Sequence, residues 1–115
     1  MDLNAFLIAL KSKPEAVEFE ETMAVIDGHY DFEPTAFKNG DTENEAGQNN
    51  GSCKIFAFGQ LNDLTVEQTL ACFGKFYRVD VLEFPENTDH QNIRNFIQNG
   101  WSGILFSQPA LALKG

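Results

Sequence analysis

Hydrophobic residues near the N-terminus recur at three- and four-residue intervals, which is the spacing of one face of an α-helix. One such set follows Asp2, a common helix-capping residue, and consists of Leu3, Phe6, Leu7 and Leu10. A second set follows Pro14, which suits a first helical turn, and consists of Ala16, Phe19, Met23 and Ile26. We therefore expect two amphipathic helices, the second ended by Gly28.

The pattern changes after residue 29, where aromatic and polar residues alternate and Pro34 prevents a helix. This favours a short edge strand at Tyr30 and Phe32. The segment 101–106, WSGILF, also has strand character, and we expect it to pair with the Tyr30 strand. The tail after Pro109 is expected to fray.

A polar segment separates these patterns, with no aliphatic residue larger than alanine between Phe37 and Ile55. Such a stretch cannot bury apolar surface, which indicates a surface loop or a binding site. Asn39-Gly40 and Asn50-Gly51 are turn signals at its two ends. We expect a short helix from Ser52 to about Leu61 to follow.

The strongest helical pattern runs from residue 65 to about residue 82. Thr65 and Gln68 form a capping box, and Val66, Leu70, Phe73, Tyr77 and Val81 share the core face. Pro85 ends this helix, and Asp89 is expected to cap a last one that stops at Gly100. The chain is thus predicted to be a single α+β domain over residues 1–115, mainly helical, with about five helices around an aromatic-rich core and one small two-stranded β element.

Composition limits the partners. The net charge is −9, from 17 acidic and 8 basic side chains, and this field repels phosphate backbones, so nucleic acid is an unlikely ligand. The longest apolar run near the start is too short to span a bilayer. The first residues lack the basic leader and the small-residue cleavage site of a secretory signal, so we expect none. Cys53 and Cys72 lie in apolar surroundings and are expected to stay reduced, as in a cytoplasmic protein. Nothing indicates a cofactor, and the oligomeric state is left open.

Four segments together resemble the HopJ type III effector family: YDFEPTAFKNG, NEAGQNNGSCK, TLACFGKFYRVDVL and DHQNIRNFIQNGWSGILF. They cover most of the chain from Tyr30 to Phe106. The resemblance implies a protein that a bacterium injects into a host cell, where a host protein is the expected partner. It implies no reaction, cofactor or residue role.

Two residues are candidates for catalysis. Cys53 follows Ser52, and a thiol in the first turn of a helix has its pKa lowered by the helix dipole. His90 would serve as its base, which would make the chain a small-molecule hydrolase or transferase. The alternative, which we favour, is that Cys53 is a small core residue and His90 merely begins the last helix.

Positive charge is scarce, so Lys54, Arg78 and Arg94 are candidate ligands for a small anion beside the helix start at Ser52. The favoured alternative is that carboxylates such as Asp80 and Asp89 hold the two arginines in ion pairs. Asn44 and Asn49 add amides that would fit an ordered binding surface.

The alternating acidic residues Asp41, Glu43 and Glu45 suggest calcium, but an EF-hand needs glycine at position six and glutamate at position twelve, where this chain has Ala46 and Ser52. No metal site is therefore predicted. We expect a binding protein of uncharacterised function with its site near residues 39–54, and the Cys–His enzyme is the second hypothesis.

Overall fold

The computed structural model describes residues 2–114 and begins with the two expected helices. Helix α1 spans Leu3–Ser12, and the Asp2 carboxylate accepts a hydrogen bond from the Ala5 amide at 2.7 Å. Pro14–Ala16 form only a short 3-10 turn, η1, so the next helix, α2, starts later than predicted, at Phe19–His29. Its N-terminus has a capping box made by Glu18 and Glu21, and it continues through Gly28 rather than stopping there.

The polar segment is not one loop. Phe37–Asn39 (β2) and Thr42–Asn44 (β3) form a hairpin, and helix α3 begins at Asn50 and ends at Leu61. Gly40 takes the first position of the two-residue turn with φ +61°, a conformation that glycine adopts without strain. The prediction of a loop is wrong here because the inward-facing positions of the hairpin carry asparagine instead of aliphatic side chains.

The predicted long helix is broken in the middle. Helix α4 covers only Val66–Ala71, and a π-helical segment, η2, follows at Phe76–Val81. Between them Gly74 adopts φ +61°, and a Cβ atom there would lie 2.6 Å from the backbone nitrogen of Phe19. The chain turns at Gly74 because the start of α2 packs directly against it.

The last third of the chain supplies one more helix and two strands. Helix α5 spans Gln91–Asn99, and a 3-10 turn, η3 (Gly100–Gly103), leads to strand β4 (Ile104–Phe106). The residue before α5 is His90, with φ +51°, so Asp89 does not cap this helix as predicted. The Asp89 carboxylate instead accepts a hydrogen bond from Arg94.

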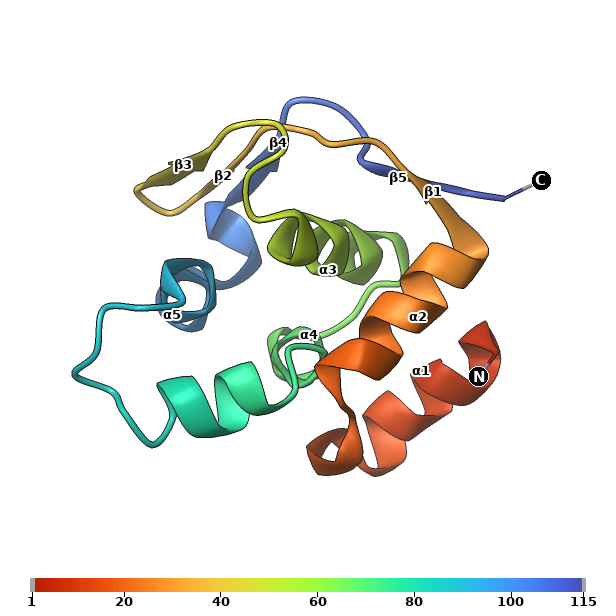
Figure 1. The fold of residues 1–115 in the computed structure, drawn as a ribbon, viewed down its shortest axis with the longest axis horizontal. Helices are drawn as coiled ribbons and strands as arrows, with labels where there is room; N and C mark the ends of the chain where they lie inside the picture. Colours follow the sequence, from red (N-terminus) through yellow and green to blue (C-terminus); the bar gives the residue numbers. More distant parts are fainter. Residues whose placement is uncertain (1, 115) are drawn as a thin grey trace.

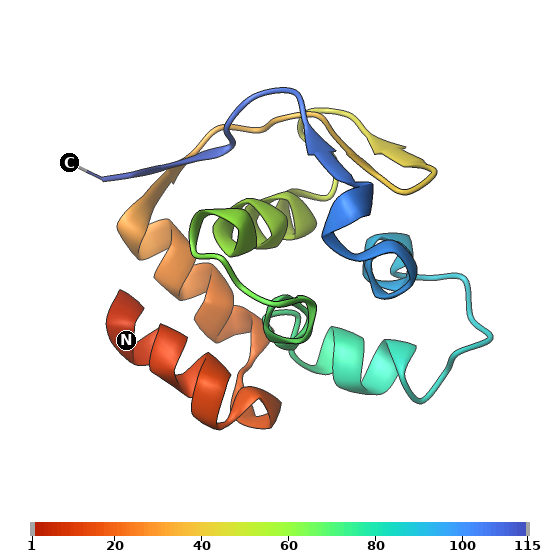
Figure 2. The same ribbon diagram turned by 180° about the vertical axis from the view of Figure 1, so that it is seen from behind.

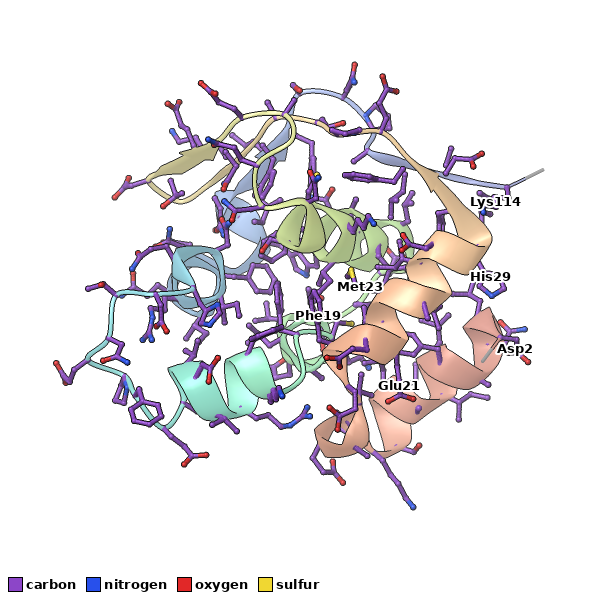
Figure 3. The ribbon with its side chains drawn as sticks, in the orientation of Figure 1. Asp2, Phe19, Glu21, Met23, His29 and Lys114 are labelled. Atoms are coloured by element: carbon purple, nitrogen blue, oxygen red, sulfur yellow. The ribbon has the colours of Figure 1, made fainter. Side chains whose placement is uncertain are left out.

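The strands form two antiparallel sheets. Strand β1 (Tyr30–Phe32) pairs with β5 (Leu111–Leu113), and the other sheet has the order β3-β2-β4. The prediction that the segment ending at residue 106 pairs with the Tyr30 strand is therefore wrong, because Phe106 lies opposite Phe37. The tail does not fray either, since Lys114 N donates to the His29 carbonyl at 3.0 Å, and both residues lie at the same end of the molecule in Figure 3.

Helix α3 lies at the centre of the fold, with the other helices around it and the strands along one side (Figures 1 and 2). Its Phe56 is fully buried, with aromatic neighbours from four other parts of the chain: Phe37, Phe73, Phe96 and Trp101. From α2, Phe19 and Met23 point inward toward this core (Figure 3). The α+β, mainly helical fold class is confirmed, with five α-helices, α1 to α5, in residues 2–114 and a second small sheet besides the two-stranded one.

Candidate functional site

Three buried asparagines join the hairpin to helix α5. The amides of Asn44 and Asn92 exchange hydrogen bonds, from Asn92 Nδ2 to Asn44 Oδ1 at 3.0 Å and from Asn44 Nδ2 to Asn92 Oδ1 at 3.1 Å. Asn39 Nδ2 donates to the Asn92 carbonyl at 2.8 Å and to its side-chain oxygen at 3.1 Å. Truncating one member would leave buried partners unsatisfied, at a cost of about 1–3 kcal/mol for each group.

Two further amides extend this asparagine network toward the surface. Asn49 Nδ2 donates to Asn44 Oδ1 at 2.7 Å, and Asn95 Nδ2 donates to Thr42 Oγ1 at 2.6 Å and to the Asn39 carbonyl at 3.2 Å. The predicted site residues Asn44 and Asn49 are thus brought together. Asn39 and Asn92 were missed, although an asparagine beside Ile93 and Phe96 on the inner face of a helix is a signal that could have indicated them.

A hollow of about 420 Å³ lies over the three-stranded sheet that this network holds in place. On the central strand β2, Lys38 is paired with Glu43 of β3 and with Leu105 of β4. Its neighbour Phe37 is paired with Asn44 of β3 and with Phe106 of β4. The rings of Phe37 and Phe106 stack at 5.3 Å. The hollow therefore offers apolar surface beside charged and amide groups.

A second hollow, of about 360 Å³, shares one lining residue with the first. Its lining comes from α3 and from the segment between β4 and β5, and includes Leu61, Gln108, Pro109 and Leu111. Phe106 lines both hollows, and Leu105 beside it is 65% exposed. We call the two hollows together the Phe106 groove.

The helix start near Cys53 differs from the prediction. Asn49, not Ser52, is the residue before α3, so Ser52 lies within the first turn. The Cys53 thiol is buried and donates to the Thr35 carbonyl at 3.5 Å. Burial raises the pKa of Cys53, and the Thr35 hydrogen bond offsets this only in part, so the expectation of a lowered pKa is wrong.

His90 has a different set of neighbours. Its Nε2 lies 3.1 Å from Asp80 Oδ2 and 3.9 Å from Asp89 Oδ2, and its ring packs against Phe76. Cys53 and His90 thus share no partner, and no contact between them supports the thiol mechanism. Both cysteines are free, and burial raises the pKa of Cys72 to about 12.

The candidate cations have separate partners too. Lys54 Nζ lies 2.8 Å from Asp27 Oδ1, and Arg78 donates to the carbonyls of Pro14 and Val17 at 3.3 and 2.7 Å. Lys54 is thus held in an ion pair, whereas Arg78 is held by backbone carbonyls and, among the described residues, not by a carboxylate as the favoured alternative expected. The structure gives no contact that brings Lys54, Arg78 and Arg94 together, so a shared anion pocket stays a prediction.

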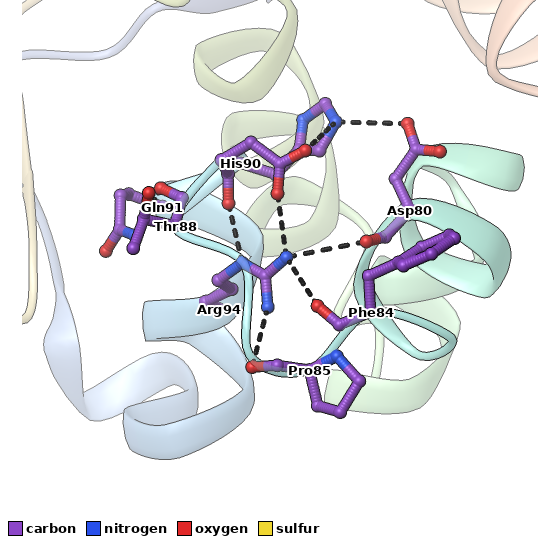
Figure 4. Close-up of polar contacts among 8 residues, drawn as sticks. Asp80, Phe84, Pro85, Thr88, His90, Gln91 and Arg94 are labelled. Atoms are coloured by element: carbon purple, nitrogen blue, oxygen red, sulfur yellow. Dashed lines mark hydrogen bonds and ion pairs between the residues drawn. The ribbon is translucent and has the colours of Figure 1, made fainter.

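Arg94 is enclosed by the segment that joins η2 to α5 (Figure 4). Its guanidinium donates to the Asp89 carboxylate at 2.7 Å, and also to the carbonyls of Asp80, Phe84, Pro85 and Asp89 at 2.6–3.4 Å. The Arg94 hydrogen bond holds the pKa of the Asp89 carboxyl below its usual range. All three guanidinium nitrogens are therefore occupied by the protein itself.

Comparison with known proteins bears on the family and the fold. A model of the HopJ type III effector protein family matches residues 3–111. The chain belongs to this family. A solved crystal structure, described as that of the unknown function protein VPA0580, is 65% identical to the chain, with a TM-score of 0.98 over 99% of this chain and 95% of that one.

A search of curated proteins found no match. The helices in residues 2–114 all fall short of the length and apolarity needed to cross a bilayer. Family and fold are thus established by two comparisons, neither of which carries a reaction or a ligand.

Proposed function

We propose that this HopJ-family chain is a binding protein that takes up a short peptide segment of a partner protein in the Phe106 groove. The observation that carries the proposal is that Phe106, on an outer strand of the sheet, lines two hollows of about 420 and 360 Å³. The groove includes Glu43, Asn44 and Glu45, so it lies beside the polar segment 39–54.

Sheet order supports a peptide as the occupant. Strands β3 and β4 are the outer strands of the order β3-β2-β4, and an outer strand presents backbone donors and acceptors that an extended peptide can pair with. Side chains of such a peptide alternate, so those on one face would lie beside Leu105 and those on the other beside Phe106, since these two neighbours in β4 point to opposite faces of the sheet. Backbone pairing would provide affinity and the two hollows specificity.

The asparagine network supports binding by a different argument. A hairpin held to the core by Phe37 as its one apolar inward side chain would be poorly anchored, and ordering it on binding would weaken affinity. Here the amides of Asn39, Asn44 and Asn92 fix the hairpin to α5 before any partner arrives. The groove is therefore preorganised.

The nature of the partner follows from charge and from family. Glu43 and Glu45 line the groove, and Lys38 is the one cation among its described lining residues, which disfavours a small anionic ligand and favours a peptide. Because the family is one of type III effectors, the proposed partner is a host protein that the chain meets after delivery into the host cell.

A displayed library of random peptides tests the proposal, with three forms of the protein as bait. Leu105→Ser removes an exposed groove residue, and Leu113→Ser is the matched control, since the two leucines are 65% and 66% exposed. We expect the wild type and Leu113→Ser to enrich the same apolar motif. Leu105→Ser should bind the enriched peptides about tenfold more weakly or not at all.

Either of two results would overturn the proposal. One is the absence of any enriched motif with the wild-type protein. The other is equal affinity of the enriched peptides for Leu105→Ser and for the wild type, which would mean that the peptides bind outside the Phe106 groove.

A further inference from the structure

A second apolar surface lies apart from the Phe106 groove, where η2 and the segment after it face helix α5. Leu82, Pro85 and Ile97 line a hollow there, and the exposed Phe84 directly precedes Pro85 in the chain. We call these four residues the 82–97 patch. Leu82, Phe84 and Ile97 are three of the large hydrophobic residues that the structure exposes, and Phe84 is 51% exposed. Exposed apolar residues gathered in one place mark interaction sites more often than single ones do.

The patch has a hollow as well as exposed side chains. The hollow measures about 300 Å³ and is lined by Val81, Leu82, Pro85, Arg94, Ile97 and Gln98. It lies between two helical elements, a common place for an inserted side chain. Its lining is mainly apolar, with the Arg94 stem at one wall.

Arg94 keeps the patch in one conformation. Its guanidinium binds the carbonyls of Phe84 and Pro85 at 3.1 and 3.3 Å, so the backbone between η2 and α5 is tied to α5. Figure 4 shows the Phe84 carbonyl directed at Arg94, with the phenyl ring pointing away from it. The ring is thus presented outward by a fixed backbone.

The surrounding charge has one sign. Residues 80–90 contain Asp80, Glu83, Glu86 and Asp89 and no lysine or arginine. Arg94, the cation closest to the patch, is occupied by Asp89 at 2.7 Å. Apolar residues within an acidic rim attract a segment that combines large apolar side chains with lysine or arginine.

We propose that the 82–97 patch docks a cationic, amphipathic segment of a partner protein, with one large apolar side chain inserted in the 300 Å³ hollow beside Ile97 and Leu82. This surface is separate from the Phe106 groove, so the inference stands or falls independently of the proposed function.

The test uses a labelled peptide of leucine and lysine, with the leucines at helical spacing, and fluorescence anisotropy at low salt. Phe84→Ser should weaken binding about tenfold. Ile8→Ser is the control, since Ile8 is 64% exposed on α1, and Leu105→Ser tests independence from the groove. Neither control should change the affinity.

A charge-matched pair separates specific docking from general attraction to a protein of net charge −9. Glu83→Gln/Glu86→Gln should weaken binding several-fold, whereas Asp31→Asn/Glu33→Gln, which removes the same charge from another surface, should not. Raising the salt concentration should also weaken binding of the peptide by the wild-type protein, because salt screens the attraction between charges.

Three results would overturn the inference: no binding by the wild-type protein, equal weakening by both double variants, or equal affinity of Phe84→Ser and Ile8→Ser. A monomer–dimer equilibrium that Phe84→Ser abolishes in sedimentation would also overturn it, because a second copy would then be the occupant. Circular dichroism melting of each variant confirms that the comparison is between folded proteins.

Discussion

Gly74→Ala is the sharpest test of how the chain turns between α4 and η2. Two costs add at this position. The left-handed backbone, φ +61°, costs a residue with a Cβ about 1–2 kcal/mol. The added Cβ would also lie 2.6 Å from Phe19 N and 3.2 Å from the Glu18 carbonyl carbon, and this backbone must move to make room.

Overpacking of this kind costs about 1–3 kcal/mol, so the free energy of unfolding should fall by about 3 kcal/mol in total. For a chain of this size that corresponds to a loss of about 10–15 °C in Tm. Gly28→Ala provides the control of opposite sign, because α2 continues past Gly28 and a Cβ there meets nothing within 4 Å. It should stabilise the protein by about 0.5–1 kcal/mol.

Urea denaturation of the three proteins, followed by the fluorescence of Trp101, measures both changes on one scale. Trp101 suits this purpose because it is the single tryptophan and packs against Phe56 and Phe96. If the free energy of unfolding of Gly74→Ala lies within about 0.5 kcal/mol of the wild-type value, α2 does not pack against Gly74 as closely as described.

Three other predictions also concern stability. Phe73→Ala should cost about 3–5 kcal/mol, because Phe73 is buried against Phe56, and a change below about 1 kcal/mol would contradict that burial. Arg94→Gln should lower Tm by several degrees, and phosphate should leave the wild-type Tm unchanged; a phosphate-dependent rise lost in the variant would favour the anion pocket instead. Burial raises the pKa of the Cys53 and Cys72 thiols, so their contribution to stability is complete below about pH 9 and should be lost as pH rises toward 12. Alkaline denaturation monitored by circular dichroism checks this, and stability that is flat above pH 9 would contradict it.

Much of the helical fold was predictable because local spacing determines it. The apolar face of α1, the capping box at Thr65 and the buried position of Phe73 all follow from intervals of three and four residues. The break at Gly74 was not predictable, since the same intervals continue across it. Only the packing of α2 against the glycine, a contact distant in sequence, forces the turn.

The hairpin shows a second limit of sequence reasoning. Its inward positions alternate as a strand should, but Asn39 and Asn44 occupy them, and buried amides do not give an apolar pattern. Asn92, from a distant helix, offsets the cost of this burial by pairing with Asn39 Nδ2 and with both amide atoms of Asn44, while the buried Asn39 Oδ1 has no partner among the described residues. Strand partners were mistaken for a related reason: three-residue strands carry too little pattern to fix which one pairs with which.

The most direct test of the central claim is a nuclear magnetic resonance titration of the wild-type protein with the most enriched library peptide. Binding at the Phe106 groove predicts that the largest amide shifts fall in residues 36–38, 43–45 and 105–111, and that they decline in proportion to affinity in Leu105→Ser. Largest shifts on α1 or α2, with those three ranges unchanged, would contradict the account.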